Sequence, residues 1–261
     1  MSHLIAQDLS LAYDGEEVIH RLSLDIPTQQ ITALIGPNGS GKTTLLRGLA
    51  RLMVPTRGAV YLDGRAIHTQ PTKQVARKLA TLPQQGSAPN DLTVRELVAF
   101  GRFPYQGILG RRSLEDEAVL ETALADAGIS HLGDAYLGEL SGGQRQLAWI
   151  AMALAQSTEL LLLDEPTTFL DMAHQIEVLE VLKRLNANQK RTIVMVLHDI
   201  NQAARYSNHM IALVDGRVAA SGAPKSILTT EMLARVFKIE ARVLLREDID
   251  APYCIPLRSL T

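Results

Sequence analysis

Residues 31–44 read ITALIGPNGSGKTT, and this segment is the strongest indication of the fold. The apolar run 31–35 predicts a short buried strand, a glycine-rich turn follows it, and a helix is predicted over about 42–52. Residues 36–43 match the pattern GxxxxGK(S/T), in the place between strand and helix that this motif requires. Strand, glycine-rich loop and helix in this order are typical of a mononucleotide-binding unit.

Each position of this loop has a chemical reason. Glycines let the backbone turn so that successive N–H groups point at phosphate oxygens, and the helix N-terminus adds partial positive charge. We expect Lys42 to reach the β- and γ-phosphates of ATP, and the Thr43 hydroxyl to ligate Mg²⁺. The alternative is a glycine-rich turn that arose by chance. The residues expected to contact the nucleotide here are Gly36, Pro37, Asn38, Gly39, Ser40, Gly41, Lys42, Thr43 and Thr44.

The rest of the chain continues an α/β pattern. Short apolar runs bounded by polar or turn residues predict buried parallel strands at 79–82, 160–163, 193–197 and 210–214. Alternating apolar residues around Asp14-Gly15 predict an antiparallel start, with strands at 3–12 and 18–27. Helical spacing, clearest over 114–127, predicts a helical subdomain at about 90–157, and short helices are expected at 224–228 and 231–237. We interpret 1–261 as one domain that ends in a short extension, about 240–261.

Composition excludes several classes of protein. The 261 residues are 46% hydrophobic, which supports a sizeable core, and a formal net charge of −2 without a basic block argues against nucleic-acid binding. The single cysteine, Cys254, cannot form an intramolecular disulfide and fits a reducing compartment. No apolar stretch approaches the ~18 to 20 residues that span a bilayer, and no secretory signal is evident. We therefore expect any membrane role to come through a partner.

Two carboxylates follow a run of four leucines. Burial of residues 160–163 places Asp164 and Glu165 at the carboxyl end of a strand, where ligands bind in parallel α/β sheets. We expect Asp164 to hold Mg²⁺ and Glu165 to polarise the attacking water as a general base. The alternative is that both acids cap a helix following Pro166.

The segment LSGGQ at 140–144 precedes a helical run over 145–156. Alone it is an ordinary helix-starting turn. However, it lies about 100 residues after the phosphate loop and shortly before the acidic strand, and in this order the chain resembles the ABC transporter nucleotide-binding subunits over almost all of residues 1–240. The resemblance implies the P-loop NTPase fold of ABC ATPases and a head-to-tail homodimer, in which this signature closes over ATP held by the other copy. The signature residues so implied are Ser141, Gly142, Gly143 and Gln144.

Further motifs of the family can be matched one at a time. Tyr13 falls where the family places an aromatic ring against adenine, although it could be only a half-buried strand tyrosine. Gln84 matches the glutamine that senses Mg²⁺ and the attacking water, and Gln85 is a rival. Asp171 is kept in the D-loop, whose sequence TFLD departs from the more frequent SALD. His198 matches the switch histidine at the γ-phosphate, although a histidine at a strand end is often structural.

A narrower resemblance connects the chain to the ATPases of bacterial ferric-siderophore importers. It rests on PQQ at 83–85, TVRELV at 93–98, GRFP at 101–104, AWIAM at 148–152 and LHDINQAARY at 197–206. It implies an ATPase on the cytoplasmic face of the bacterial inner membrane, bound to an integral permease that a periplasmic binding protein supplies. Because no residue here would touch the iron chelate, this substrate rests on family analogy alone. An ATPase for haem or vitamin B12 import is the alternative.

The docking surface for the permease is expected within residues 87–112, which carry Phe100, Phe103 and Tyr105. These aromatic residues could equally belong to the core of the helical subdomain.

Three rival functions are compatible with parts of the pattern. A soluble ABC ATPase for DNA repair or translation would carry a long coiled coil or two tandem cassettes, and the sequence has neither. A P-loop GTPase would carry NKxD for the guanine base, which is absent, and a P-loop kinase would need a phosphate acceptor. An ABC exporter subunit shares the ATP chemistry but differs in the direction of transport.

Overall fold

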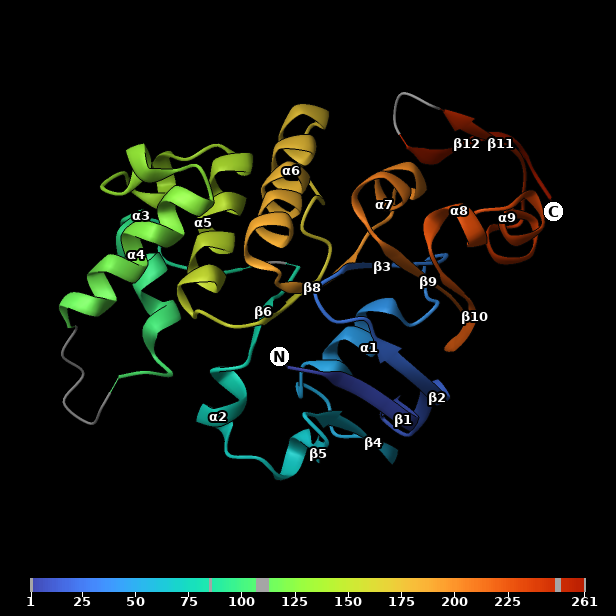
Figure 1. Cartoon of the computed structure of the whole chain (residues 1–261), viewed down its shortest axis with the longest axis horizontal. Helices are drawn as coiled ribbons and strands as arrows, with labels where there is room; N and C mark the ends of the chain where they lie inside the picture. Colours follow the sequence, from blue (N-terminus) through green and yellow to red (C-terminus); the bar gives the residue numbers. More distant parts are fainter. Residues whose placement is uncertain (1, 85, 107–112, 247–249, 261) are drawn as a thin grey trace. The chain divides into compact units, whose positions relative to one another are not determined.

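The computed structural model describes residues 2–84, 86–106, 113–246 and 250–260 (Figure 1). The chain divides into two compact units, and each is built around its own strands. The first unit comprises Met1–Thr69 and Thr192–Thr261, and the second comprises Gln70–Arg191.

The first unit begins with an antiparallel sheet of order β2-β1-β4-β5. The two leading strands form a hairpin in which Tyr13 pairs with Glu16. The turn residues Asp14 and Gly15 both have positive φ, 47° and 88°, as a two-residue hairpin turn requires. The antiparallel start predicted from the sequence is confirmed. Its strands are β1 (Leu4–Tyr13), β2 (Glu16–Ile26), β4 (Arg57–Leu62) and β5 (Arg65–Ala66).

Four more strands of the first unit lie in the order β10-β9-β3-β8. The central strand β3 (Ile31–Ile35) is buried along its whole length and pairs in parallel with β8 (Thr192–Val196) and β9 (His209–Val214). A strand covered on both faces is mostly apolar, which explains why ITALI, with Thr32 as its one polar residue, does not alternate. The outer strand β10 (Arg217–Gly222) is antiparallel to β9. The predicted mostly parallel α/β sheet is therefore confirmed.

Helices and a hairpin complete the first unit. The helix after the phosphate loop is α1 (Lys42–Leu49), shorter than the predicted 42–52 because the chain leaves the helix at Ala50. The predicted final extended piece is a two-stranded hairpin. The other elements are η1 (Ile67–Thr69), α7 (Ile200–Tyr206), α8 (Pro224–Ile227), α9 (Thr230–Phe237), β11 (Ile239–Arg246) and β12 (Ala251–Ser259).

The second unit is mainly helical, and a parallel strand pair, β6 (Leu79–Leu82) and β7 (Leu160–Leu163), runs through it. Four of its α-helices begin at side-chain caps: Thr93, Ser113 and Ser141 form capping boxes, and Asp171 caps the longest helix. The helices are α2 (Thr72–Ala76), α3 (Val94–Ala99), η2 (Phe100–Arg102), α4 (Leu114–Asp126), η3 (Ser130–Leu132), η4 (Leu137–Glu139), α5 (Gly142–Ala155) and α6 (Met172–Gln189).

A buried ion pair ties the helices of the second unit together. The guanidinium of Arg102, a residue only 5% exposed, donates from Nε to Asp116 at 2.7 Å and from Nη1 to the carbonyl of Ala155 at 3.0 Å. It also lies over the ring of Tyr105, 4.0 Å from the centroid. One side chain therefore connects η2, α4 and the end of α5, so the predicted helical segments form one packed body.

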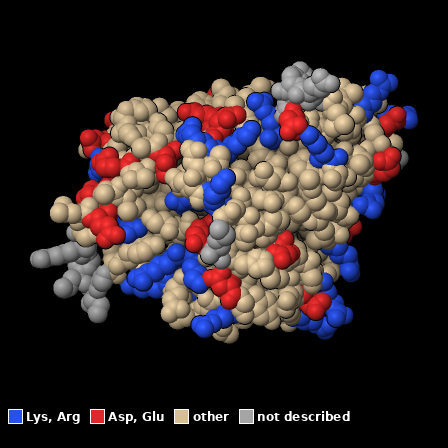
Figure 2. Space-filling view, in the orientation of Figure 1, with Lys and Arg blue, Asp and Glu red and all other residues tan. Residues whose placement is uncertain are grey.

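The surface carries both signs of charge. On the face drawn in Figure 2, Lys and Arg side chains are interspersed with Asp and Glu. Among the residues that the structure describes, no helix combines the length and the apolar character that crossing a membrane requires.

Candidate functional site

The predicted site residues fall into two sets, one in each unit. In the first unit, the phosphate loop surrounds the side chain of Lys42. Lys42 is 5% exposed, and its Nζ donates to the carbonyls of Gly36 at 2.9 Å and Pro37 at 2.8 Å. The Oγ of Ser40 lies 3.5 Å from the same nitrogen. The ammonium group is thus held inside the loop by oxygen atoms, an arrangement that phosphate oxygens can replace with stronger, charge-assisted bonds.

Glycines are required at two points of this loop. A Cβ added to Gly36, which has φ 148°, would lie 2.3 Å from the carbonyl oxygen of Leu213. Gly41 has φ 95° and is the N-cap of α1, where no side chain bonds the first helical N–H groups. The start of α1 therefore presents backbone N–H donors together with Lys42, and the donor set suits a phosphate chain.

Tyr13 and His198 belong to the same unit. Tyr13 ends β1, is 41% exposed, and its hydroxyl accepts a hydrogen bond from Arg47 of α1 at 3.2 Å. His198 is exposed and follows β8, the parallel neighbour of β3. Since Leu34 pairs with Val196, Gly36 and His198 both follow the same edge of the sheet. The first unit thus places both residues on neighbours of the elements that carry the phosphate loop, since Tyr13 bonds to α1 and His198 follows the strand that pairs with β3.

In the second unit, three side chains meet around Glu165. The Nε2 of Gln84 donates to Glu165 Oε2 at 2.6 Å, and the hydroxyl of Thr168 donates to the same oxygen at 2.9 Å. Glu165 has φ 52°, a left-handed conformation that a non-glycine residue adopts at some cost. Two donors on one oxygen fix the orientation of this carboxylate, as a general base requires. The rival Gln85 lies outside the described residues.

The neighbouring Asp164 is 4% exposed, and its backbone N–H donates to the carbonyl of Leu82 at 2.9 Å. Residues 166–169 form turns, and α6 begins only at Met172 with Asp171 as its N-cap. The alternative that Asp164 and Glu165 cap the following helix is therefore wrong, because a turn separates them from that helix. Asp171 does the capping: its Oδ1 accepts from the backbone N–H of His174 at 2.9 Å.

The signature segment forms the start of α5. Ser141 Oγ accepts from the backbone N–H of Gln144 at 3.2 Å, and Gln144 Oε1 accepts from the backbone N–H of Ser141 at 3.0 Å. This reciprocal pair fixes the turn, while Gly142 and Gly143 provide the first helical N–H groups. The segment is thus a helix-starting turn, and it is also a second possible anion site.

The residues expected to hold Mg²⁺ would each ligate it through an oxygen atom, which a hard cation prefers. They are the Thr43 hydroxyl in the first unit, and the Asp164 carboxylate and the Gln84 amide in the second. Since Nε2 of Gln84 donates to Glu165, Oε1 is the atom that can ligate a cation. Among the described residues, no group of three or more His, Cys, Asp or Glu side chains is arranged to hold a metal. The oxygen donors of Thr43, Asp164 and Gln84 fit Mg²⁺, which binds few protein oxygens and usually keeps several waters beside substrate phosphates.

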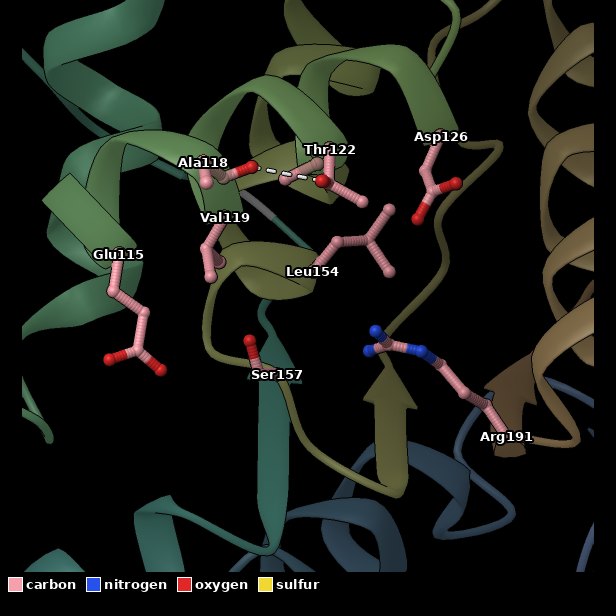
Figure 3. Close-up of a pocket in the computed structure, with 9 residues that line it drawn as sticks. Glu115, Ala118, Val119, Thr122, Asp126, Leu154, Ser157 and Arg191 are labelled. Atoms are coloured by element: carbon pink, nitrogen blue, oxygen red, sulfur yellow. Dashed lines mark hydrogen bonds between the residues drawn. The ribbon is translucent and has the colours of Figure 1, made fainter.

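A pocket of about 220 Å³ lies elsewhere in the second unit, lined by α4, the end of α5 and Arg191 (Figure 3). Burial lowers the pKa of Arg191, and the charge of Asp126 opposes that shift. Arg191 donates to the side chain of Gln189 at 2.6 Å and to the carbonyl of Thr158 at 3.1 Å. These bonds show that the guanidinium of Arg191 stabilises the local fold. None of the predicted site residues lines this pocket.

The sequence pattern of the ABC transporter family matches residues 19–168. This chain belongs to the ABC transporter family. The iron(3+)-hydroxamate import ATP-binding protein of Bacillus subtilis is 48% identical over 98% of the cassette and 95% of that protein. The ferric enterobactin transport ATP-binding protein of Escherichia coli is 47% identical over the same shares of both chains.

The fold of the cassette is also found in solved structures. The cassette is similar to a chain of an ABC transporter assigned to the metal-chelate type and solved in an inward-facing conformation, with a TM-score of 0.85 and 30% identity over 98% of both chains. It is also similar to a dimeric bacterial ABC transporter cassette, with a TM-score of 0.73 and 29% identity over 84% of this chain and 98% of that one. Cassettes of this family dimerise and pair with a transporter permease.

Sequence reasoning missed two residues of the second unit. Thr168 was noted only as a departure from the frequent D-loop serine, yet its hydroxyl binds Glu165 three residues earlier. His174 was not singled out, although it contacts both the D-loop and the signature segment. For Thr168 the short spacing after Glu165 was an available signal, whereas the packing of His174 on Gly143 joins residues that are far apart in sequence.

Proposed function

We propose that the cassette is the ATP-hydrolysing subunit of a bacterial importer for iron–siderophore complexes. The observation that carries this proposal is its near-full-length identity, 47–48%, to ATP-binding proteins of ferric-hydroxamate and ferric-enterobactin import. The phosphate loop, the oriented Glu165 and the capped signature turn support the ATPase chemistry. In this proposal residues 1–261 act as one ATP-binding domain, peripheral to the cytoplasmic face of the inner membrane.

In the proposed mechanism two copies bind ATP head to tail. The phosphate loop and Lys42 of one copy bind the β- and γ-phosphates, while Ser141 and the N–H of Gly143 from the other copy bind the γ-phosphate. When bound, Mg²⁺ supplies charge neutralisation at the phosphates, held by Thr43, Asp164 and Gln84. The free energy of closing the dimer moves the attached permease.

Hydrolysis then opens the dimer. Glu165, oriented by Gln84 and Thr168, accepts a proton from the attacking water, and His198 contacts the γ-phosphate. Tyr13 stacks on adenine, and Asp171 shapes the contact between the copies. Cleavage adds charge repulsion between the products and removes the γ-phosphate contacts, so the two copies separate.

The permease is proposed to dock on the aromatic segment of the second unit. Phe100 and Phe103 are 38% and 57% exposed, and their rings stack with centroids 5.2 Å apart. An exposed aromatic pair suits an apolar helix of a partner. Residues 107–112 of the expected docking segment 87–112 lie outside the described residues.

The importer assignment is tested by purifying the cassette from detergent-solubilised membranes and identifying the bound proteins by mass spectrometry. We expect an integral permease, and uptake of ⁵⁵Fe-labelled siderophore that is lost with Glu165→Gln. Recovery with an exporter would contradict the direction of transport. Uptake of labelled cobalamin or haem in place of iron would contradict the cargo. Either result would leave the ATPase chemistry intact.

The head-to-tail arrangement is tested by disulfide crosslinking. One sample carries Ser40→Cys and a second, of different length, carries Ser141→Cys, both with Cys254→Ala and Glu165→Gln so that ATP stays bound. We expect a crosslink between the two lengths that depends on ATP. Control mixtures in which both samples carry Ser40→Cys should stay uncrosslinked, and an ATP-dependent product only in that control would sink the arrangement.

A further inference from the structure

His174 connects two functional turns of the second unit. It is the third residue of α6, and its ring Nδ1 lies 2.8 Å from Oδ1 of Asp171, which also accepts from the His174 backbone N–H. These two hydrogen bonds lower the pKa of the Asp171 carboxyl, the backbone bond most. An ionised carboxylate only accepts hydrogen bonds, so Nδ1 carries the proton. The ring is therefore fixed by the D-loop aspartate.

The other side of the ring faces the signature segment. A Cβ added to Gly143 would lie 2.1 Å from Cδ2 and 2.4 Å from Cγ of His174, far inside contact distance. Gly142 is close to the same turn, because a Cβ added there would lie 3.7 Å from Leu170 Cδ2. The absence of a side chain at Gly143 is thus required by the His174 ring, in addition to any need for a phosphate to approach its N–H. These contacts pack the start of α5 against the start of α6.

We propose that His174 is a positioning residue that holds the signature turn against the D-loop. The proposal rests on the proposed ATP-driven dimer. His174 itself need not touch the nucleotide. Its ring packs against the backbone at Gly143, and its Nδ1 binds Asp171. The signature segment and the D-loop, which both face the second copy in the proposed dimer, therefore keep a fixed position relative to each other. Losing either contact should weaken dimer closure while leaving the phosphate loop, which lies in the first unit, able to bind ATP.

Three substitutions separate the two contacts of the ring. His174→Asn keeps a donor near the position of Nδ1 but removes the ring, His174→Phe keeps a ring but removes the donor, and His174→Ala removes both. In a Glu165→Gln background we expect His174→Ala to weaken ATP-dependent dimerisation about tenfold, and the other two to weaken it less. ATP affinity of the monomer should stay within about twofold of the parent. The matched control is His131→Ala, an exposed histidine of the same unit, which should change neither quantity.

Kinetics and a rescue distinguish positioning from simple support of the fold. With Glu165 intact, His174→Ala should lower kcat and leave KM nearly unchanged. Gly143→Ala should abolish closure because its methyl collides with the ring, and Gly143→Ala with His174→Ala should close better than Gly143→Ala alone. Equal damage from Gly143→Ala in both backgrounds, or a folded His174→Ala protein that closes and turns over like the parent, would overturn the proposal.

Failure of the proposed function gives a different result. A parent protein that binds ATP but never dimerises would contradict the head-to-tail dimer and the role assigned to His174 within it. The contact between residues 143 and 174 would still be tested by the free energies of unfolding of the parent, Gly143→Ala, His174→Ala and the double variant. If the two residues are in contact, the changes in unfolding free energy of the two single variants do not add up to that of the double variant.

Discussion

The phosphate loop of the first unit and the acid cluster of the second unit are built in opposite ways. Lys42 bonds to oxygen atoms that lie within six residues of it along the chain. Glu165 is oriented by Thr168, three residues away, and by Gln84, 81 residues away. The first site is a property of one contiguous segment, whereas the second exists only when β6 and β7 lie side by side. A local motif can be identified from sequence, and a cluster of this second kind is completed only by the fold.

Glu165→Gln should give the largest effect, because it removes the proton acceptor while keeping the size of the side chain. We expect kcat for ATP hydrolysis to fall by about 10²- to 10⁴-fold, with ATP affinity retained and the closed dimer accumulating. Steady-state ATPase assays and size-exclusion chromatography measure this. Glu177→Gln, on the exposed side of α6, is the control and should keep full turnover. Full activity in Glu165→Gln would remove this residue from the role of base.

Arg102→Ala tests the frame that holds the long-range cluster. Removing one partner of the buried Arg102–Asp116 pair should lower the free energy of unfolding by about 3 to 5 kcal/mol, since the remaining carboxylate is left buried and unpaired. Urea denaturation measures the change. Arg184→Ala, at a more exposed position of the same unit, is the control and should cost less than about 1 kcal/mol. Equal costs at both positions would show that the buried pair does not stabilise this unit.

The same pair predicts a pH dependence. Backbone and side-chain hydrogen bonds, first from Ser113 and then from Arg102, hold the pKa of Asp116 below its ordinary value of 3.8. A carboxyl whose pKa is lowered in the folded state stabilises the fold fully above its unfolded pKa, and this contribution is lost as the pH falls through the folded pKa. We therefore expect unfolding free energy measured between neutral pH and pH below 3.8 to fall less steeply in Asp116→Asn than in the parent. Parallel curves would exclude Asp116 as a source of acid sensitivity.

Lys42→Ala disrupts the local site. The ammonium group should contribute charge-assisted bonds of about 1.5 to 3 kcal/mol to the phosphates, so we expect ATP affinity to fall by about 10- to 150-fold. Isothermal titration with ATP and Mg²⁺ measures it, and Lys73→Ala on α2 is the control. The phosphate loop is one contiguous segment of the first unit, whereas the cluster around Glu165 belongs to the second unit. The loss of Lys42 should therefore leave the geometry of that cluster unchanged. Normal nucleotide affinity in Lys42→Ala would contradict the assignment of the loop.

Ser141→Ala should give the smallest effect on stability, because it removes one local cap from α5. The loss of the bond to the N–H of Gln144 should lower the free energy of unfolding by about 1 kcal/mol. ATP-dependent dimerisation should fall further than this cost alone explains, since Ser141 is also proposed to bind the γ-phosphate of the other copy. Ser113→Ala, which removes an equivalent cap from α4, should lose similar stability and leave dimerisation unchanged. Identical dimerisation losses in the two variants would remove the second role of Ser141.

Much of the fold could be predicted because its signals are local. The buried strands β3 and β7 are uninterrupted apolar runs, and the helix caps are single side chains a few residues from their partners. Strand β4 was not predicted, since Gly58 interrupts it and only part of it is buried. Strand β4 is stabilised by its backbone hydrogen bonds to β1, and a sequence pattern does not show which strands pair. The helix cap at Asp171 was also missed, because Pro166 suggested an earlier helix start than the turn at 166–169 allows.

The amino-acid order alone was enough to predict the phosphate loop, the acidic strand end and the order of the motifs, since each depends on neighbouring residues and on the geometry of one strand or one helix. The packed chain was needed to show which side chain orients Glu165, why Gly143 must lack a side chain, and how Arg102 joins three helical segments. All three depend on interactions of short range. Hydrogen bonds and steric contacts act over a few ångströms, and residues 14 to 81 positions apart come within that distance only after the chain has packed.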